Sequence, residues 1–200
     1  MFLPELSYHR DQHGAIDRGV TRLSQEKTLL EARRFRVVSL EYRDGDGRPH
    51  TREVVRHPGA VTILPLISPD RVCLIRNYRA GVDQTLLELP AGTLEPGEDP
   101  RNTALRELQE ETGYQAQQME LLCEFYTSPG ILDELMRLYV ATGLTVGPQR
   151  LDEGEEIETQ VVDWDECLRL VQQGAIRDGK SLVGILLYDN LRRNSGGEPA

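Results

Sequence analysis

Residues 92–114 read GTLEPGEDPRNTALRELQEETGY, and this stretch decides the fold because it carries its own signals for the start and end of a helix. Asp99 is a favourable N-cap, and Pro100 suits the first helical position. Gly113 suits the left-handed residue that follows a last helical turn. The residues between Asp99 and Gly113 are therefore predicted to form a helix behind a glycine-bearing loop.

The predicted helix carries its acidic residues on one face. At about 100° per residue, Glu107, Glu110 and Glu111 fall within one arc. Three apolar residues lean toward the other side: Ala104, Leu105 and Leu108. Most such clusters are solvated acidic faces, but like charges at Glu107 and Glu111 weaken a helix by a few tenths of a kcal/mol. A bound cation would turn this repulsion into coordination, and carboxylate oxygens suit Mg²⁺ or Mn²⁺.

Length and charge limit the classes of function. A chain of 200 residues fits one domain, or one domain with a modest extension, and we expect no second independent domain. The net charge of −10 argues against nucleic acid as a partner. An anionic substrate would need metal ions in order to approach.

The cysteines and the apolar runs indicate the compartment. Cys73, Cys123 and Cys167 are odd in number and lack a CxxC spacing, so neither a disulfide framework nor a zinc site is predicted. No apolar run is long enough to span a membrane, and the first residues lack the order of a signal peptide. We expect a cytoplasmic protein with buried, reduced cysteines and no membrane partner.

The remaining chain predicts a mixture of strands and helices. Residues 1 to about 30 are interpreted as a tail that passes into a short strand or helix. Two strands follow, joined by a hairpin at 44–47 (DGDG). Apolar runs predict further strands at 60–67, 72–78, 86–89, 119–126 and 136–142 and one ending at 161–162, and helical spacing predicts helices at 163–173 and 180–191. This order indicates an α+β sandwich.

The spacing of the fixed positions in residues 92–114 resembles the Nudix box. The matching positions are Gly92, Glu98, Arg106, Glu107, Leu108, Glu110, Glu111, Gly113 and Tyr114. The resemblance implies an α/β/α sandwich, the Nudix fold, with an N-terminal antiparallel β extension. It also implies three parts: 1–57, a tail and small sheet for dimerisation; 58–194, the Nudix hydrolase domain; and 195–200, a flexible tail.

The same resemblance implies a Mg²⁺-dependent hydrolase of nucleoside diphosphates linked to another moiety. Glu107 and Glu111 would be direct metal ligands, and the backbone carbonyl of Ala91 a further one. Glu110 would be a ligand or would orient water, while Arg106 would brace the loop together with Glu98. An ordinary i,i+4 ion pair between Arg106 and Glu110 is the compatible alternative. For Gly92, a tight turn is at least as good an interpretation as a substrate contact.

Two segments beyond the box resemble the ADP-ribose pyrophosphatase group. Residues 126–130 (YTSPG) are followed by Glu134, which in that group lies near the substrate; a Pro-Gly turn is the alternative interpretation. The acidic segment 151–158 (LDEGEEIE) would be a solvated loop if it stood alone. By resemblance it supplies Glu153 as the general base, with Glu155 as an additional metal contact.

Substrate recognition and assembly are also implied by the resemblance. Arg52, Glu53 and Arg79 would contact the substrate, although surface charge is the alternative for each. Phe35 could stack on the base from a partner subunit, but we favour a core position in the N-terminal sheet. The group commonly forms dimers through N-terminal strands, so we expect a homodimer.

The leading hypothesis is therefore hydrolysis of ADP-ribose, with Mg²⁺, to AMP and ribose 5-phosphate. The rival enzymatic hypothesis is another nucleoside diphosphate sugar, such as GDP-mannose or ADP-glucose. A non-catalytic nucleotide sensor is the alternative from a different class. The complete carboxylate set of the box favours the enzyme over the sensor.

Overall fold

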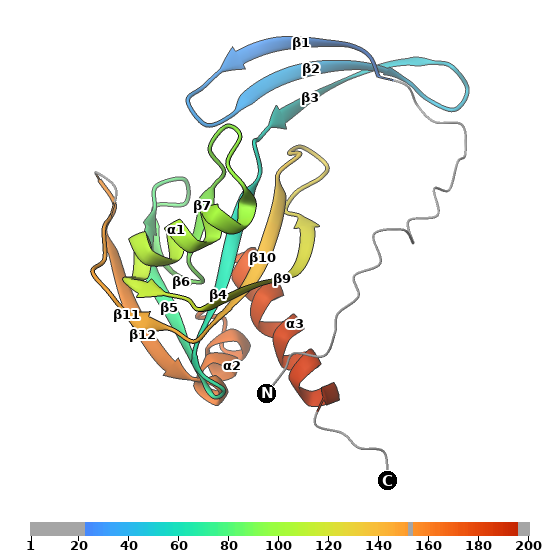
Figure 1. Cartoon of the computed structure of the whole chain (residues 1–200). Helices are drawn as coiled ribbons and strands as arrows, with labels where there is room; N and C mark the ends of the chain where they lie inside the picture. The colour runs from blue at the N-terminus through green and yellow to red at the C-terminus, as the bar shows by residue number, and fades with distance from the viewer. Residues whose placement is uncertain (1–22, 152–153, 196–200) are drawn as a thin grey trace. The chain divides into compact units, whose positions relative to one another are not determined.

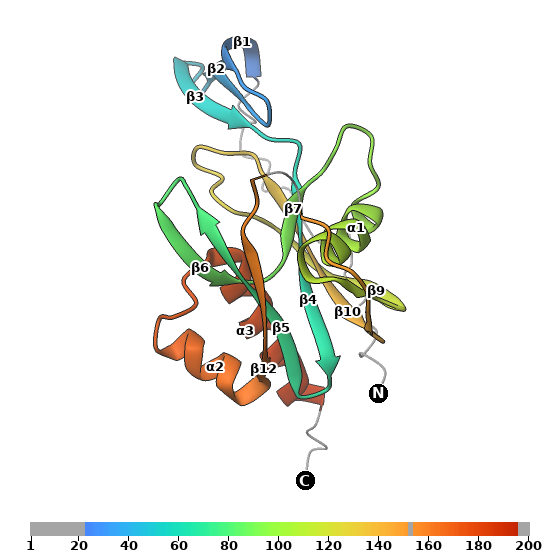
Figure 2. The ribbon, with the colours of Figure 1, turned by 90° about the vertical axis from the view of Figure 1, so that its left-hand side faces the viewer.

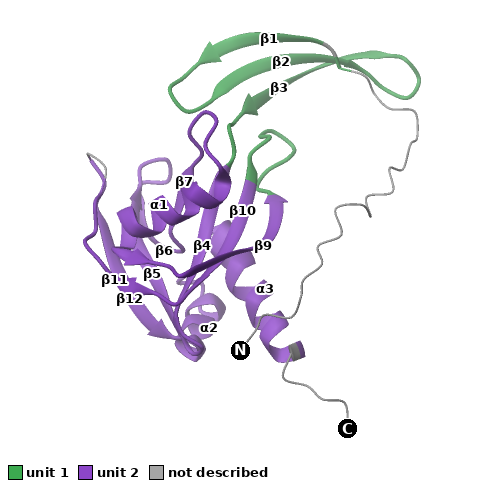
Figure 3. Cartoon of the chain, viewed as in Figure 1, with its two compact units in different colours: residues 1–59, 126–135 green, residues 60–125, 136–200 purple. Residues whose placement is uncertain are grey.

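The computed structural model describes residues 23–151 and 154–195, which form two compact units (Figure 3). Unit 1 combines the described part of Met1–Gly59 with Tyr126–Leu135, and unit 2 combines Ala60–Phe125 with the described part of Met136–Ala200. No sequence pattern indicated that residues 126–135 group with the N-terminal segment.

Unit 1 is built on a three-stranded antiparallel sheet of β1 (Leu23–Glu31), β2 (Arg36–Arg43) and β3 (Pro49–Arg56). The predicted hairpin between β2 and β3 is present. Asp44 Oδ1 accepts hydrogen bonds from the backbone N–H groups of Asp46 (3.0 Å) and Arg48 (2.9 Å). Gly47 has a φ of +79°, which a residue with a side chain rarely adopts. The local chemistry of the turn thus explains the pairing of the two strands.

Residues 126–135 are bound to the end of β3 by backbone and side-chain contacts. The Val55 N–H donates to the carbonyl of Ile131 (2.8 Å), and the Asp133 N–H donates to the carbonyl of Val55 (3.1 Å). The Asp133 carboxylate pairs with Arg56 Nη1 (2.9 Å) and accepts from the His57 N–H (2.7 Å). These contacts explain why the segment belongs to unit 1.

Unit 2 contains a seven-stranded mixed sheet (Figure 1). Its main order is β12-β5-β4-β10-β9; β6 pairs with β5, β7 pairs with β4, and β4 and β10 run parallel. A separate antiparallel pair is formed by β8 and β11. The strands are β4 (Ala60–Ser68), β5 (Arg71–Arg79), β6 (Gln84–Glu88), β7 (Ala91–Thr93), β8 (Tyr114–Gln115), β9 (Gln118–Tyr126), β10 (Leu135–Thr142), β11 (Thr145–Val146) and β12 (Ile157–Asp163).

The helices α1 (Pro100–Thr112), α2 (Trp164–Gln172) and α3 (Gly179–Ser195) cover the sheet, with α1 on one face and α2 and α3 on the other (Figure 2). On the α1 face, a buried cluster joins helix and sheet: Val61, Ile63, Ala104, Leu108, Met119, Tyr139 and Ala141. On the opposite face, Gly184 of α3 approaches Leu138 and Leu89 so closely that a Cβ would lie 2.8 Å from the Leu89 side chain. The layered α+β fold is as predicted.

The predicted strands and helices are present, with boundaries shifted by a few residues. The short strands β7, β8 and β11 were not predicted, because two or three residues cannot show an alternating pattern. Among the described residues, none of the helices has the length and apolar character required to cross a membrane.

Candidate active site

The helix α1 begins and ends where its capping residues predicted. Asp99 Oδ1 accepts hydrogen bonds from the backbone N–H groups of Arg101 (3.0 Å) and Asn102 (3.2 Å). Gly113 adopts the left-handed conformation, with φ +74°, and its N–H donates to the carbonyl of Gln109 (2.8 Å). The acidic residues of α1 therefore occupy a helix with well-defined ends.

Glu111 is a buried side chain rather than part of a solvated face. It is 3% exposed, and its Oε2 accepts a hydrogen bond from the Ala91 N–H at 2.8 Å. This bond ties α1 to the first residue of β7. The alternative of a solvated acidic face is therefore wrong for Glu111, and the bond places Ala91 beside its carboxylate.

Gly92 allows Glu107 to approach the strand β7. A Cβ at position 92 would lie 1.9 Å from the Glu107 carboxylate carbon, far below any contact that two atoms can tolerate. Gly92 lies in a strand, so the tight-turn interpretation is wrong. An alanine at position 92 would therefore displace the Glu107 side chain from the space that its carboxylate occupies.

Arg106 binds three carboxylates of the site. Its Nε and Nη2 donate to the two oxygens of Glu98 (3.0 and 3.1 Å), and its Nη1 donates to Glu107 and Glu110 (both 2.8 Å). The hydrogen bond to Glu98 is the largest of the effects that raise the pKa of Arg106. The bracing by Glu98 and Arg106 and the i,i+4 pair with Glu110 are thus both present.

The side chains of Glu107 and Glu111 lie where the charged form of a carboxyl group is disfavoured. Burial raises the pKa of Glu107 to about 7, against the lowering effect of Arg106. Burial also raises the pKa of Glu111 to about 8, against the Ala91 hydrogen bond. Glu155 lies close enough to raise the pKa of both groups further. Removing carboxylates from water disfavours their charged form, and a cation bound between them would restore it.

The donor set fits a hard divalent cation. Glu107, Glu111 and Glu155 offer carboxylate oxygens, which Mg²⁺ and Mn²⁺ prefer. Within residues 23–151 and 154–195, no three His, Cys, Asp or Glu side chains already surround a common point as a metal cage. Arg106 pairs with one oxygen of Glu107 and one oxygen of Glu110, and the second oxygen of each carboxylate is not bonded to Arg106.

The segment 147–150 joins the end of α1 to the acidic loop. Gln149 Nε2 donates to the carbonyls of Glu111 (2.7 Å) and Ile157 (3.2 Å), and the Arg150 N–H donates to the carbonyl of Glu110 (3.0 Å). Sequence reasoning missed Gln149, although the last carbonyls of a helix need donors from outside it. Glu155 belongs to this loop, whereas Glu153 lies outside the described residues.

Arg79, at the end of β5, is the cationic group of unit 2 that acts on Glu111 from the sheet. Its charge lowers the pKa of Glu111, and its Nε donates to Glu88 at 2.8 Å. The sequence predicted Arg79 as a substrate contact. It did not predict Glu88, whose position among apolar neighbours (LLELP) was a usable signal because buried charges require partners.

The other predicted substrate contacts belong to unit 1. Arg52 and Glu53 are exposed on β3, with the Arg52 guanidinium 5.9 Å from the Tyr42 ring centre. Glu134 accepts a hydrogen bond from Thr127 Oγ1 at 2.6 Å and lies 3.6 Å from His57 Nδ1. Phe35 is 40% exposed, so the favoured interpretation of a core position is wrong for the single chain.

Comparison with known proteins places this geometry in a family. The model of the NUDIX domain matches residues 56–182. The chain is 42% identical to the methanol dehydrogenase activator of Bacillus methanolicus over 82% of its own length and 92% of the relative. It is 38% identical to the ADP-ribose pyrophosphatase of Bacillus subtilis (80% and 91%) and 36% identical to the GDP-mannose pyrophosphatase of Cronobacter sakazakii (72% and 80%).

A solved structure has the same fold. The crystal structure of an ADP compounds hydrolase superposes with a TM-score of 0.77 over 88% of this chain and 96% of the other, at 24% sequence identity. Since the family model covers more than half of the chain and includes the helix that carries the clustered carboxylates, this protein belongs to the NUDIX domain family.

Proposed function

We propose that the protein hydrolyses the pyrophosphate bond of ADP-ribose to AMP and ribose 5-phosphate in a Mg²⁺-dependent reaction. The observation that carries the proposal is the desolvated pair Glu107 and Glu111, held beside Ala91 with a deficit of positive charge. The relative from Bacillus subtilis, an ADP-ribose pyrophosphatase, supports the choice of substrate.

The metal would be held by Glu107, Glu111 and Glu155, with the carbonyl of Ala91 as a further donor and Glu110 as a ligand or water-orienting group. When bound, Mg²⁺ or Mn²⁺ neutralises phosphate oxygens and lowers the pKa of a coordinated water. Arg106 acts on the site by fixing Glu107 and Glu110, each at 2.8 Å. It is therefore a positioning residue.

In the proposed reaction, Glu153 is the general base. It accepts a proton from the attacking water, whose oxygen forms a new bond to one phosphorus. The bond from that phosphorus to the bridging oxygen breaks, and the second phosphate leaves with the bridging oxygen. The anchoring of the loop by Gln149 supports a base delivered from residues 151–158.

The proposed substrate contacts are charged side chains and one aromatic ring. Arg79 supplies a guanidinium for the anionic part of the substrate, since guanidinium groups bind phosphate through paired hydrogen bonds. Arg52, Glu53 and Glu134 supply the contacts of unit 1, and Phe35 supplies a ring that can stack on the base within a homodimer.

The homodimer is supported by the surface of unit 1. Its three-stranded sheet, together with the connection between β1 and β2, leaves four large apolar side chains exposed: Leu23, Leu29, Leu30 and Phe35. So small a sheet with exposed apolar residues is marginal unless another surface covers it. Sedimentation equilibrium at micromolar concentration tests the dimer, and a monomer at all concentrations would exclude it.

The location in the cell is a further part of the proposal. The three cysteines are free, and Cys73 and Cys167 are buried, which supports a reducing cytoplasm.

The activity is tested with purified protein, Mg²⁺ and a panel of ADP-ribose, ADP-glucose and GDP-mannose, with separation of the nucleotide products by chromatography. We expect AMP from ADP-ribose at the highest kcat/KM. Faster turnover of GDP-mannose would favour the rival substrate, which the relative from Cronobacter sakazakii supports. Binding of ADP-ribose without any product at saturating Mg²⁺ would indicate a sensor.

A further inference from the structure

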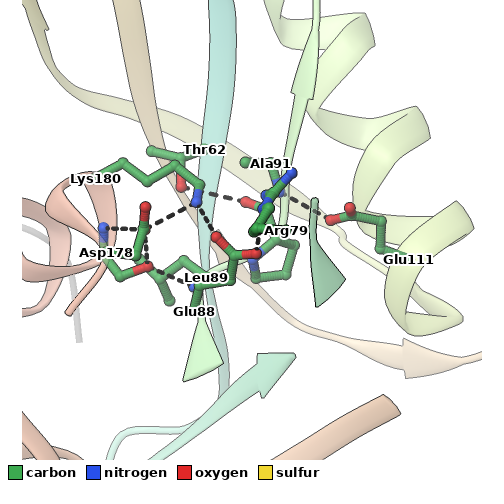
Figure 4. Close-up of polar contacts among 10 residues, drawn as sticks. Thr62, Arg79, Glu88, Leu89, Ala91, Glu111, Asp178 and Lys180 are labelled. Atoms are coloured by element: carbon green, nitrogen blue, oxygen red, sulfur yellow. Dashed lines mark hydrogen bonds and ion pairs between the residues drawn. The ribbon is translucent and has the colours of Figure 1, made fainter. Parts of the chain in front are cut away.

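A second cluster of charged residues, only partly buried, lies in unit 2 (Figure 4). Its centre is Glu88 at the end of β6, which is fully buried. One carboxylate oxygen of Glu88 accepts a hydrogen bond from Arg79 Nε at 2.8 Å, and the other accepts one from Lys180 Nζ. The two oxygens of Glu88 are thus bound by two different cations.

The start of α3 holds this cluster in place. Lys180 Nζ also donates to Asp178 Oδ2 (2.8 Å), which accepts from the backbone N–H (3.0 Å) and hydroxyl (2.6 Å) of Ser181. The Ser181 Oγ in turn accepts from the Leu89 N–H at 2.7 Å. The start of α3 is therefore bonded to both Glu88 and Leu89, and the chain from Leu89 leads within two residues to Ala91.

The charges within this cluster cancel. Glu88 and Asp178 are negative, and Arg79 and Lys180 are positive, so the four groups are neutral without Glu111. A buried network of this kind is a weak source of stability, because apolar residues of the same size serve as well or better. A conformational role is the more economical reason for placing four charges here.

The pairing with Glu88 determines how the Arg79 side chain is placed. Its side chain is 40% exposed, and among the described residues its hydrogen bond and ion pair are both with Glu88, through Nε. The terminal nitrogens Nη1 and Nη2 are the paired donors that suit phosphate. Because Nε is bonded to Glu88, the guanidinium is held away from a full ion pair with Glu111. The carboxylate of Glu111 therefore stays available for the proposed metal.

We infer that Glu88 is a positioning residue for substrate binding: held by Lys180, it fixes Arg79 so that the terminal nitrogens of the guanidinium face the anionic part of the substrate. The inference rests on the proposed function, because it assigns Arg79 to a substrate phosphate. It adds a residue that acts without touching the substrate, and it explains why a charge is buried in an otherwise apolar segment of β6.

The test is a double-mutant cycle on ligand affinity, with Glu88→Gln, Arg79→Ala and the combined variant. Binding of ADP-ribose is measured by calorimetry in EDTA, so that the readout does not depend on the metal or on turnover. We expect Glu88→Gln to raise Kd by about tenfold, consistent with a displaced charge-assisted contact. In the Arg79→Ala background, the same change should alter Kd by less than about twofold.

Steady-state kinetics with Mg²⁺ supply a second readout. Glu88→Gln should raise KM for ADP-ribose by a factor similar to that for Kd and leave kcat within about threefold, because the box residues are untouched. Glu124→Gln is the matched control. It breaks another partly buried ion pair, Glu124 with Arg137 Nε at 2.8 Å, and should change neither Kd nor KM.

A loss of stability with unchanged Kd, or equal effects of Glu88→Gln with and without the Arg79 side chain, would overturn the inference. Should Glu88→Gln fail to fold, Glu88→Asp replaces it, because the shorter side chain keeps the negative charge but moves it away from Arg79. The effect of Glu88→Asp on Kd must then also disappear in the Arg79→Ala background. Absence of ADP-ribose hydrolysis by the wild type would instead defeat the proposed function. The two failures are therefore distinguishable.

Discussion

The carboxylates of α1 and the buried cluster around Glu88 are linked through residues 88–91, yet they balance their charge in opposite ways. In the box, Glu98, Glu107 and Glu110 share one cation, Arg106, and Glu111 is bonded to a backbone N–H. In the second cluster, two carboxylates, Glu88 and Asp178, are matched by two cations, Arg79 and Lys180, and Lys180 pairs with both carboxylates. Under the proposed function, the deficit of cations in the box leaves a place for a metal ion, and the balanced set of charges acts as a rigid support.

The largest expected effect comes from removing a carboxylate of the box, where carboxylates outnumber cations. Glu111→Gln should lower kcat by a factor on the order of 10⁴, because a metal ligand is lost. The fold should survive, since the amide can still accept the Ala91 hydrogen bond and is less costly to bury than a carboxylate. Turnover assays and thermal unfolding in EDTA measure the two effects. A rate near that of the wild type would remove Glu111 from the site.

Glu153→Gln tests whether the acidic loop supplies a general base or only negative charge. We expect kcat to fall by about 10² to 10³, the usual contribution of a general base. The affinity for Mn²⁺, measured by electron paramagnetic resonance, should change little, in contrast to that of Glu111→Gln. Unaltered turnover would move the base to another acid of the loop, with Glu155 and Glu156 as the next variants.

Gly92→Ala perturbs the box without removing any ligand. The added Cβ would lie 1.9 Å from the Glu107 carboxylate carbon, so the side chain of Glu107 must move. We expect Mn²⁺ affinity to fall by roughly 10- to 100-fold, as for other changes that misplace a ligand. Gly45→Ala, where nothing lies within 4 Å of an added Cβ, is the matched control and should bind Mn²⁺ as the wild type does. Equal affinities in the two variants would contradict the proposed role of Glu107.

The sequence predicts the two regions unequally well. The ends of α1 follow from Asp99, Pro100 and Gly113, whose conformational preferences act within one turn of the helix. The acidic face follows from helical periodicity and from the resemblance to a known box. Local chemistry and the resemblance together therefore predict the helix and its acidic face.

The cluster around Glu88, in which the charges balance, depends on contacts between residues that are distant in the sequence. Glu88 and Lys180 are separated by 92 positions, and no local pattern pairs them. The contact of Gln149 with the carbonyl of Glu111, 38 positions away, likewise depends on tertiary packing. A charged residue within an apolar strand indicates that a partner exists, but the identity of the partner is set by tertiary packing.

The smallest expected effect is a difference in how stability depends on pH. Burial raises the pKa of Glu111 from 4.5 to about 8, so the folded state binds the proton more tightly than the unfolded state. Stability in EDTA should therefore be highest below pH 4.5 for this group and fall as the pH rises toward about 8. Glu111→Gln should make the curve less steep in that range, where Glu107, whose pKa burial raises to about 7, still contributes.

The contribution of Asp178 to stability should depend on pH in the opposite direction. Lys180 and Ser181 lower its pKa below 3.8 despite its burial, so its contribution is present above that pH and is lost as the pH falls further. Asp178→Asn should therefore flatten the acid end of the curve and leave the slope between about pH 5 and about pH 8 unchanged. Denaturant unfolding at a series of pH values measures both slopes. If both variants flattened the same range, the two clusters would not differ in charge balance, and the distinction between metal site and support would fail.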